Sequence, residues 1–148
     1  MTRIRLAAIL LGALVLGQGG VASSARAAEP AWSQKEVTGL AENLARVLGD
    51  TAAAAREAPP QATVLQQRTR DDALRSFNRV REAADDYLAK LRKGWDRDLT
   101  ESYFRALKRQ FRDARGLARD AVPTKTVDEK LSEAEELIEK LSRFYPNA

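Results

Sequence analysis

The stretch TVDEKLSEAEELIEKLSRFYP, residues 126–146, decides the fold class. Its apolar residues repeat at alternating intervals of four and three, and they are Val127, Leu131, Ala134, Ile138, Leu141 and Tyr145. This spacing places them along one side of an α-helix, as in the seam of a helix that packs against other helices. Thr126 with Glu129 predicts a capped start, and Pro146 an end, because proline lacks the amide hydrogen that a continuing helix needs.

Three earlier segments have the same helical periodicity. The first begins at Ser33, which forms a predicted capping box with Glu36, and it ends at the prolines of residues 59–60. The second begins at Thr63 or Thr69 and ends near residue 94, and the third extends from Asp98 to the proline at residue 123. No alternating apolar pattern bounded by turn residues indicates a strand.

The apolar stripes of the middle two segments define the expected core. In the second segment they are Leu74, Phe77, Val80, Ala84, Leu88 and Leu91, with Tyr87 at the edge. In the third they are Tyr103, Leu107, Phe111, Ala114, Leu117, Ala118 and Ala121. Four amphipathic helices with short connections predict an all-α fold, an antiparallel four-helix bundle.

The first 27 residues have the three-part layout of a secretory signal peptide. Arg3 and Arg5 precede an uncharged apolar run over residues 6–17, and the small residues Ala25 and Ala27 form a small-x-small pattern just before a predicted cleavage site after Ala27. The run is shorter than the roughly 20 residues that a membrane-spanning helix needs. We therefore expect residues 1–27 to be removed and residues 28–148 to form one exported domain, periplasmic or secreted. Cleavage after Ala25 is the alternative, since Ser23 is also small.

Export changes the charge of the molecule. The whole chain has 25 basic and 21 acidic residues, but the signal segment contains three arginines and no acid. The mature part is left with 22 basic and 21 acidic residues. This near-neutral balance argues against nucleic-acid binding, which depends on a clear excess of basic charge.

The chain contains neither histidine nor cysteine. Ser-His-Asp and Cys-His catalysis are therefore excluded, as are the usual zinc and haem sites and the Glu-x-x-His motif of di-iron bundles. The adjacent acids at 71–72, 85–86 and 135–136 diverge by about 100° on a helix, so they do not converge on one ion. We expect a protein that is not an enzyme and has no cofactor or metal.

The third segment carries a basic face opposite its apolar stripe. The face consists of six residues within about 120° of a helical wheel. They are Arg105, Lys108, Arg109, Arg112, Arg115 and Arg119. Such a face is either a docking surface for an acidic protein or anionic lipid, or a solvated surface partly paired with acids of the fourth segment.

Trp95 lies in the turn between the second and third segments. It either packs over the end of the bundle or stands as an anchor for a partner, since tryptophan contributes strongly to interfaces.

Two stretches, RVREAADDYLAKLRK (residues 79–93) and KLSEAEELIEKLSR (residues 130–143), resemble helices of the small lumenal four-helix proteins of photosystem II. These are extrinsic and assembly-factor proteins of cyanobacteria and chloroplasts. The resemblance implies a non-enzymatic protein that docks on the lumenal face of the photosystem, in the thylakoid lumen. Two features differ from that family: residues 105–119 are rich in arginine, and there is no cysteine for lipid attachment.

The leading expectation is an exported helical bundle that binds another protein, as an extrinsic subunit, assembly factor or chaperone-like adaptor. The alternative is a peripheral membrane protein that binds anionic lipid through its basic face. The sequence leaves the identity of the partner and the oligomeric state open.

Overall fold

The computed structural model describes residues 31–59 and 62–148. Within these ranges the chain forms four α-helices and no strand: α1 (Gln34–Glu57), α2 (Val64–Arg92), α3 (Arg97–Ala121) and α4 (Lys125–Ser142). The all-helical prediction is confirmed. The predicted signal peptide, residues 1–27, lies outside the described residues.

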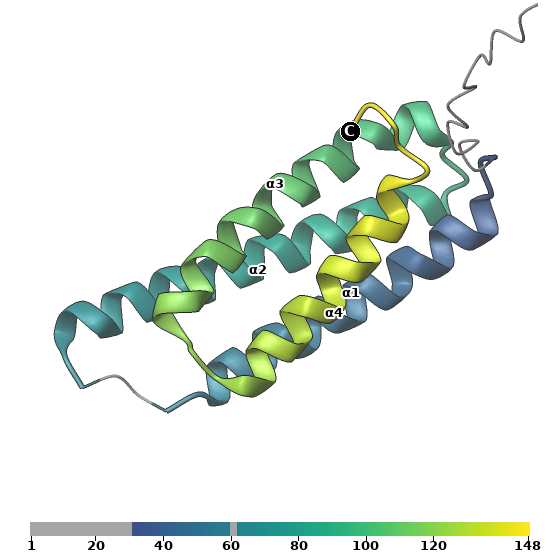
Figure 1. The fold of residues 1–148 in the computed structure, drawn as a ribbon. Helices are drawn as coiled ribbons and strands as arrows, with labels where there is room; N and C mark the ends of the chain where they lie inside the picture. Colours follow the sequence, from purple (N-terminus) through teal and green to yellow (C-terminus); the bar gives the residue numbers. More distant parts are fainter. Residues whose placement is uncertain (1–30, 60–61) are drawn as a thin grey trace, which may run out of the picture.

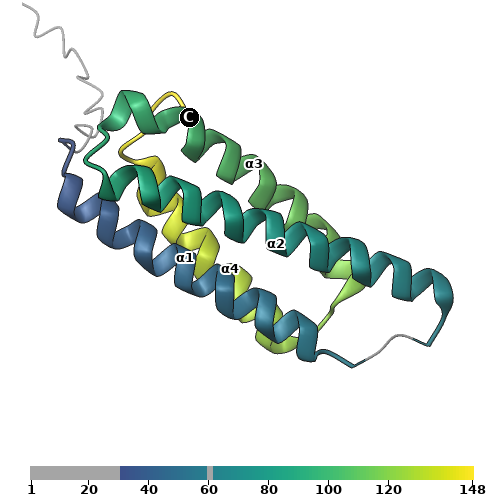
Figure 2. The same cartoon turned by 180° about the vertical axis from the view of Figure 1, so that it is seen from behind.

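The helices lie side by side along one long direction, as the two opposite views in Figures 1 and 2 show. Contacts between α1 and α2 fix their relative positions. Arg92 of α2 lies 2.9 Å from Glu42 near the start of α1, and Arg56 near the end of α1 lies 2.5 Å from Asn78. The first turns of α1 therefore lie beside the last turns of α2.

Two of the four predicted helix starts are confirmed. The side-chain oxygen of Ser33 accepts a hydrogen bond from the amide of Glu36, which satisfies one of the donors left free at a helix start. Thr63 and Gln66 form a complete capping box, so α2 begins at the earlier of its two predicted starts.

The other two predicted starts are wrong by two residues. Helix α3 is capped by Asp96 rather than residue 98, and α4 by Thr124 rather than residue 126. Gly94 has a φ of +79° and turns the chain so sharply that Asp96 already reaches the amide of Leu99. Thr124 directly follows Pro123, and its hydroxyl accepts a hydrogen bond from the amide of Val127. Helix α4 therefore begins immediately after the proline that separates it from α3.

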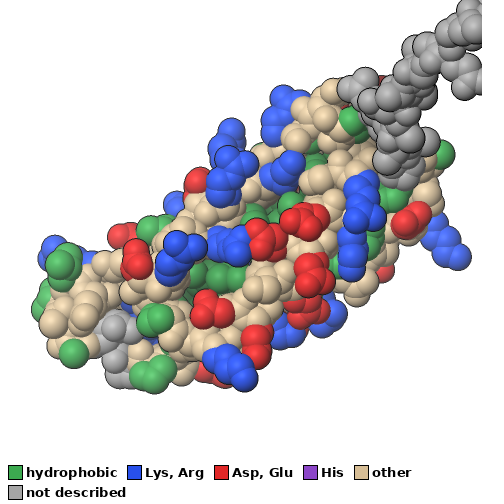
Figure 3. Space-filling model, in the orientation of Figure 1, with side chains coloured by type: hydrophobic (Ala, Val, Ile, Leu, Met, Phe, Trp, Pro, Cys, Tyr) green, Lys and Arg blue, Asp and Glu red, His purple; other side chains and the backbone are tan. Residues whose placement is uncertain are grey.

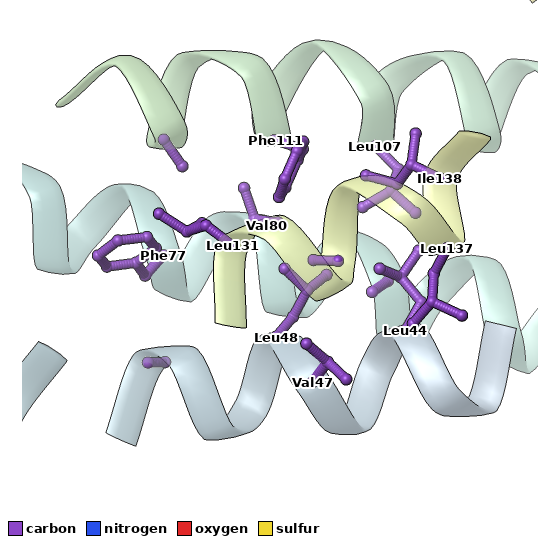
Figure 4. Close-up of a cluster of buried hydrophobic side chains, with 14 of the residues drawn as sticks. Leu44, Val47, Leu48, Phe77, Val80, Leu107, Phe111, Leu131, Leu137 and Ile138 are labelled. Carbon is purple, nitrogen blue, oxygen red and sulfur yellow. The ribbon is translucent and has the colours of Figure 1, made fainter. Parts of the chain in front are cut away.

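The core combines side chains from all four helices, as Figure 4 shows for its central part. The predicted seam of α4 is buried in full. The sequence prediction was wrong about Tyr87, which is fully buried rather than at the edge, and it missed Phe104, also fully buried. Phe104 replaces the half-buried Tyr103 on the inner side of α3.

Aromatic side chains fill the end of the bundle where α1 begins and α4 ends. Tyr145, just beyond α4, stacks on Phe104 with ring centres 4.7 Å apart, and the ring of Trp32 meets it edge-on at 5.5 Å. The Tyr145 hydroxyl lies 2.8 Å from those of Tyr87 and Thr100. These hydrogen bonds join α2, α3 and the chain after α4, and so close this end of the bundle.

The four helices are not packed evenly. Helix α2 packs extensively against α1 and α3, and α4 packs extensively against α1, whereas α3 and α4 share few contacts. The seam between α3 and α4 is therefore the open side of the bundle, and it is the side that the predicted basic face borders.

Candidate protein-docking face

Helix α3 turns its basic side toward α4. Its buried side chains lie on the core side, and one of them, Phe111, is only 5 % exposed and also lines the seam with α4. Arg115 is the basic residue nearest α4 and forms an ion pair with Glu135 of that helix. The other basic residues follow on the solvent side of Arg115, because each residue advances by about 100°. Lys108, Arg112 and Arg119 lie beside the open seam, whereas Arg109 lies about 120° from Arg115 around the helix and does not line it.

Two of the basic residues hold the chain that follows α4. Arg105 forms an ion pair with Glu101 and donates a hydrogen bond to the carbonyl of Asn147 at 3.3 Å. The ammonium group of Lys108 donates to the carbonyl of Ala148 at 2.8 Å and lies over the ring of Phe104. These two side chains therefore stabilise the chain segment at the closed end of the bundle.

The remaining three basic residues have no such role. Arg109, Arg112 and Arg119 are exposed, and none of them forms an ion pair with any residue that the structure describes. The predicted six-residue face is therefore divided into three engaged and three available cations.

Helix α4 also carries unpaired acids: two of them, Asp128 and Glu139, lie beside the seam, and the third, Glu136, lies on the outer side of the helix. Asp128, Glu136 and Glu139 are exposed and make no ion pair within the described part of the chain. The sequence left open whether acids of α4 partly pair with the basic face, and the only such contact among the described residues is the one between Arg115 and Glu135.

Two hollows occupy the seam, one on each side of the Arg115–Glu135 pair. Each is about 260 to 270 Å³ in volume, and Arg115 lines both. Arg112 and Glu139 border the first hollow, and Arg119 and Asp128 border the second. Figure 3 shows the result as basic side chains over α3, acidic ones over α4 and apolar surface between them. We call this surface the α3/α4 face: it consists of the two hollows, the four unpaired charges that border them, and the neighbouring Arg109 and Glu136.

Trp95 lies apart from the α3/α4 face. It is half-buried in the connection between α2 and α3, where its ring meets Tyr103 edge-on at 5.9 Å. The ammonium group of Lys90 lies 4.8 Å from the centre of the indole. The side chain therefore packs over the end of the bundle, the first of its two predicted roles.

The α3/α4 face could be predicted only in part. The six basic residues were identifiable from their spacing, but the gap between α3 and α4 was not. One signal was present: Glu135 and Ser142 occupy the positions of α4 that face α3, where a closely packed pair of helices would have large apolar side chains.

The described residues offer no sign of a metal site or a membrane span. No group of three or more acidic side chains among them could hold a metal ion. In a separate search of the same residues, no helix was both long and apolar enough to cross a membrane.

Comparisons with known proteins found no match among protein-family models, curated proteins or solved structures.

Proposed function

We propose that this protein is an exported, non-enzymatic antiparallel four-helix bundle that binds another protein through the α3/α4 face. Such a protein would act as an extrinsic subunit, an assembly factor or a chaperone-like adaptor. The observation that carries the proposal is the pair of unpaired arginines Arg112 and Arg119 beside an open seam, with the unpaired Arg109 next to them on α3. Exposed like charges on one helix repel each other and contribute nothing to packing, so the fold itself does not require them.

A protein partner fits this face better than a lipid surface does. An anionic membrane would attract the arginines of α3 but repel Asp128 and Glu139, which border the same hollows on the α4 side. A protein can present charges of both signs in register, and such complementarity gives specificity and fast association. Binding to anionic lipid remains the second candidate, supported by the same three arginines.

The predicted signal peptide supports the exported location in this proposal. Processing after residue 27 would leave four residues before Trp32, which is the first side chain packed against the core among the described residues. The processed protein would occupy the periplasm or be secreted, or would occupy the thylakoid lumen if the photosystem resemblance holds. Mass spectrometry of the protein from its native host should give a chain that begins at Ala28. An intact Met1 on protein from the cytoplasm would contradict export.

The docking proposal is tested with the triple change Arg109→Gln, Arg112→Gln and Arg119→Gln. Immobilised wild-type protein should retain a partner from a native envelope extract at about 50 mM salt and release it at about 300 mM, where charges are screened beyond about 6 Å. The triple variant should fold with an unchanged melting temperature and lose that retention.

The matched control is the triple change Arg68→Gln, Arg79→Gln and Lys93→Gln. These three exposed cations lie outside the α3/α4 face, and their removal changes the net charge equally. Equal retention by the two triple variants would refute a specific role for the face. Loss of binding to anionic vesicles alone, with no retained protein, would favour the lipid alternative.

A further inference from the structure

The unpaired charges of the α3/α4 face are equal in number on the two helices, and four of them lie opposite one another across the groove between α3 and α4. Three cations lie on α3 and three acids on α4. Arg112 lines the same hollow as Glu139, and Arg119 the same hollow as Asp128. Arg112 and Arg119 therefore each have an acid at the same position along the other side of the groove, yet neither forms an ion pair with it; the only α3–α4 ion pair among the described residues is the one between Arg115 and Glu135.

This arrangement is self-complementary about one particular two-fold axis. If the axis lies in the plane of the interface and runs parallel to the groove, it places α3 of one copy over α4 of the other. Every residue then keeps its position along the direction of the groove. Arg112 of one copy then faces Glu139 of its partner, and Arg119 faces Asp128. An axis across the groove would instead place α3 over α3, with like charges opposed.

We propose that the α3/α4 face binds a second copy of this chain in a symmetric dimer, with the two-fold axis along the groove. The inference rests on the proposed function, since it takes the same face as the docking surface and names its occupant. Both arginine–acid pairs occur twice in such a dimer, because the interface is isologous.

The size of the face suits a weak association. Helix α4 has 18 residues and so measures about 27 Å, and two adjacent helices are about 20 Å wide. Each copy would contribute roughly 500 Å², or about 1,000 Å² in total, which is near the lower limit for a specific interface. With so many charges in it, the association should be strongly dependent on salt.

A dimer of this kind would control access to the face. A different protein could bind the face only after the two copies separate. Dilution would then expose the face, and a high local concentration would cover it.

The experiment is a charge-reversal cycle followed by analytical ultracentrifugation over a range of protein concentrations. Wild-type protein should dimerise at about 20 mM salt, with a dissociation constant at least about tenfold higher at about 300 mM. The variant Arg112→Glu/Arg119→Glu should be monomeric, since both walls of its groove are acidic. The variant Asp128→Arg/Glu139→Arg should be monomeric too, since both walls are basic.

Two combinations should restore the dimer. Mixing the two reversed variants should give a heterodimer, because each basic wall then faces an acidic one. Carrying all four changes in one chain should give a homodimer again. The control Arg68→Glu/Arg79→Glu alters two exposed arginines of α2, and it should dimerise like wild type. Circular dichroism confirms the helical fold of each variant.

The outcomes separate this inference from the proposed function. Wild-type protein that stays monomeric at low salt, or reversed variants that still dimerise, would overturn the inference. The docking proposal would then depend only on the retention experiment with the Gln variants. A dimer that obeys the whole cycle supports the inference. If the Gln variants also retain envelope proteins unchanged, binding of a different protein through this face fails while the dimer stands.

Discussion

The two sides of α4 differ in how many of their charged residues form ion pairs with the neighbouring helix. On the flank that meets α1, Lys130 lies 3.1 Å from Glu133 and 4.0 Å from Asp50, and Arg46 lies within 3.8 Å of both acids. On the flank toward α3, a single pair with Arg115 spans the gap. The difference shows that charged residues between α4 and α1 form ion pairs that join these two helices, whereas most charged residues between α4 and α3 form none with any other described residue.

The largest expected effect comes from truncating one buried side chain on each side of α4. Leu44 of α1 is fully buried, and Leu44→Ala should cost about 3 to 5 kcal/mol in unfolding free energy. Ile138 lines a hollow of the α3/α4 seam, and Ile138→Ala should cost about 2 to 3 kcal/mol, because water can enter the enlarged hollow. Urea unfolding of both variants measures the difference. A larger cost at Ile138 would mean that the seam is closed in solution.

The next test concerns the end where the seam closes. Tyr145→Phe removes the hydroxyl that joins Tyr87 and Thr100, and it leaves the buried Tyr87 hydroxyl without this partner. We expect a loss of about 1 to 3 kcal/mol, the cost of an unsatisfied buried polar group. Tyr103→Phe is the control, since Tyr103 is half-buried and lies outside this network. Equal melting temperatures for the two variants would contradict a structural role for the network.

Alkaline pH should weaken the same closed end. Burial is the main cause that raises the pKa of Tyr87 far above its usual range, and burial also raises the pKa of Tyr145. The folded chain keeps these protons while the unfolded chain releases them above a pKa of about 10. The stabilisation by the neutral hydroxyls is therefore complete below pH 10 and is lost as the pH rises above it. Unfolding free energies measured from neutral pH to about pH 11 should fall less steeply for Tyr145→Phe.

The smallest expected effects compare charges on the two flanks directly. Lys130 is 31 % exposed and contacts two acids, so Lys130→Gln should cost about 0.5 to 1 kcal/mol. Arg112→Gln removes an exposed cation that has no ion pair among the described residues, and its effect on stability should be close to zero. Thermal melts at low salt resolve the two. A clear loss for Arg112→Gln would show that this cation does contribute to the fold.

The number, type and inner side of the helices were predictable from local pattern. The seam from Val127 to Tyr145 and the caps at Ser33 and Thr63 depend on residues close in sequence, and each is present. The caps at Asp96 and Thr124 were missed because neighbouring acids and threonines offer equivalent capping pairs. The choice between them depends on where the previous helix ends.

The candidate site was harder to predict than the fold. Spacing along α3 identified its basic face, but the closeness of α3 to α4 is a property of the assembled bundle. Arg105 and Lys108 look equivalent to Arg112 and Arg119 in sequence, yet the first two hold the backbone of residues 147–148. Only the path of the chain after α4 separates these two pairs.

The uneven packing has a consequence for how the molecule opens. Along most of its length α4 is attached to the bundle through α1, since it shares few contacts with α3. Separation of α4 would leave the pairs formed by α1, α2 and α3 intact. Such a partial opening exposes the amides of α4 to solvent exchange at a lower free energy than global unfolding. The slowest-exchanging amides should therefore lie in α1 and α2, at the centre of the row of helices, and those of α4 should exchange earlier.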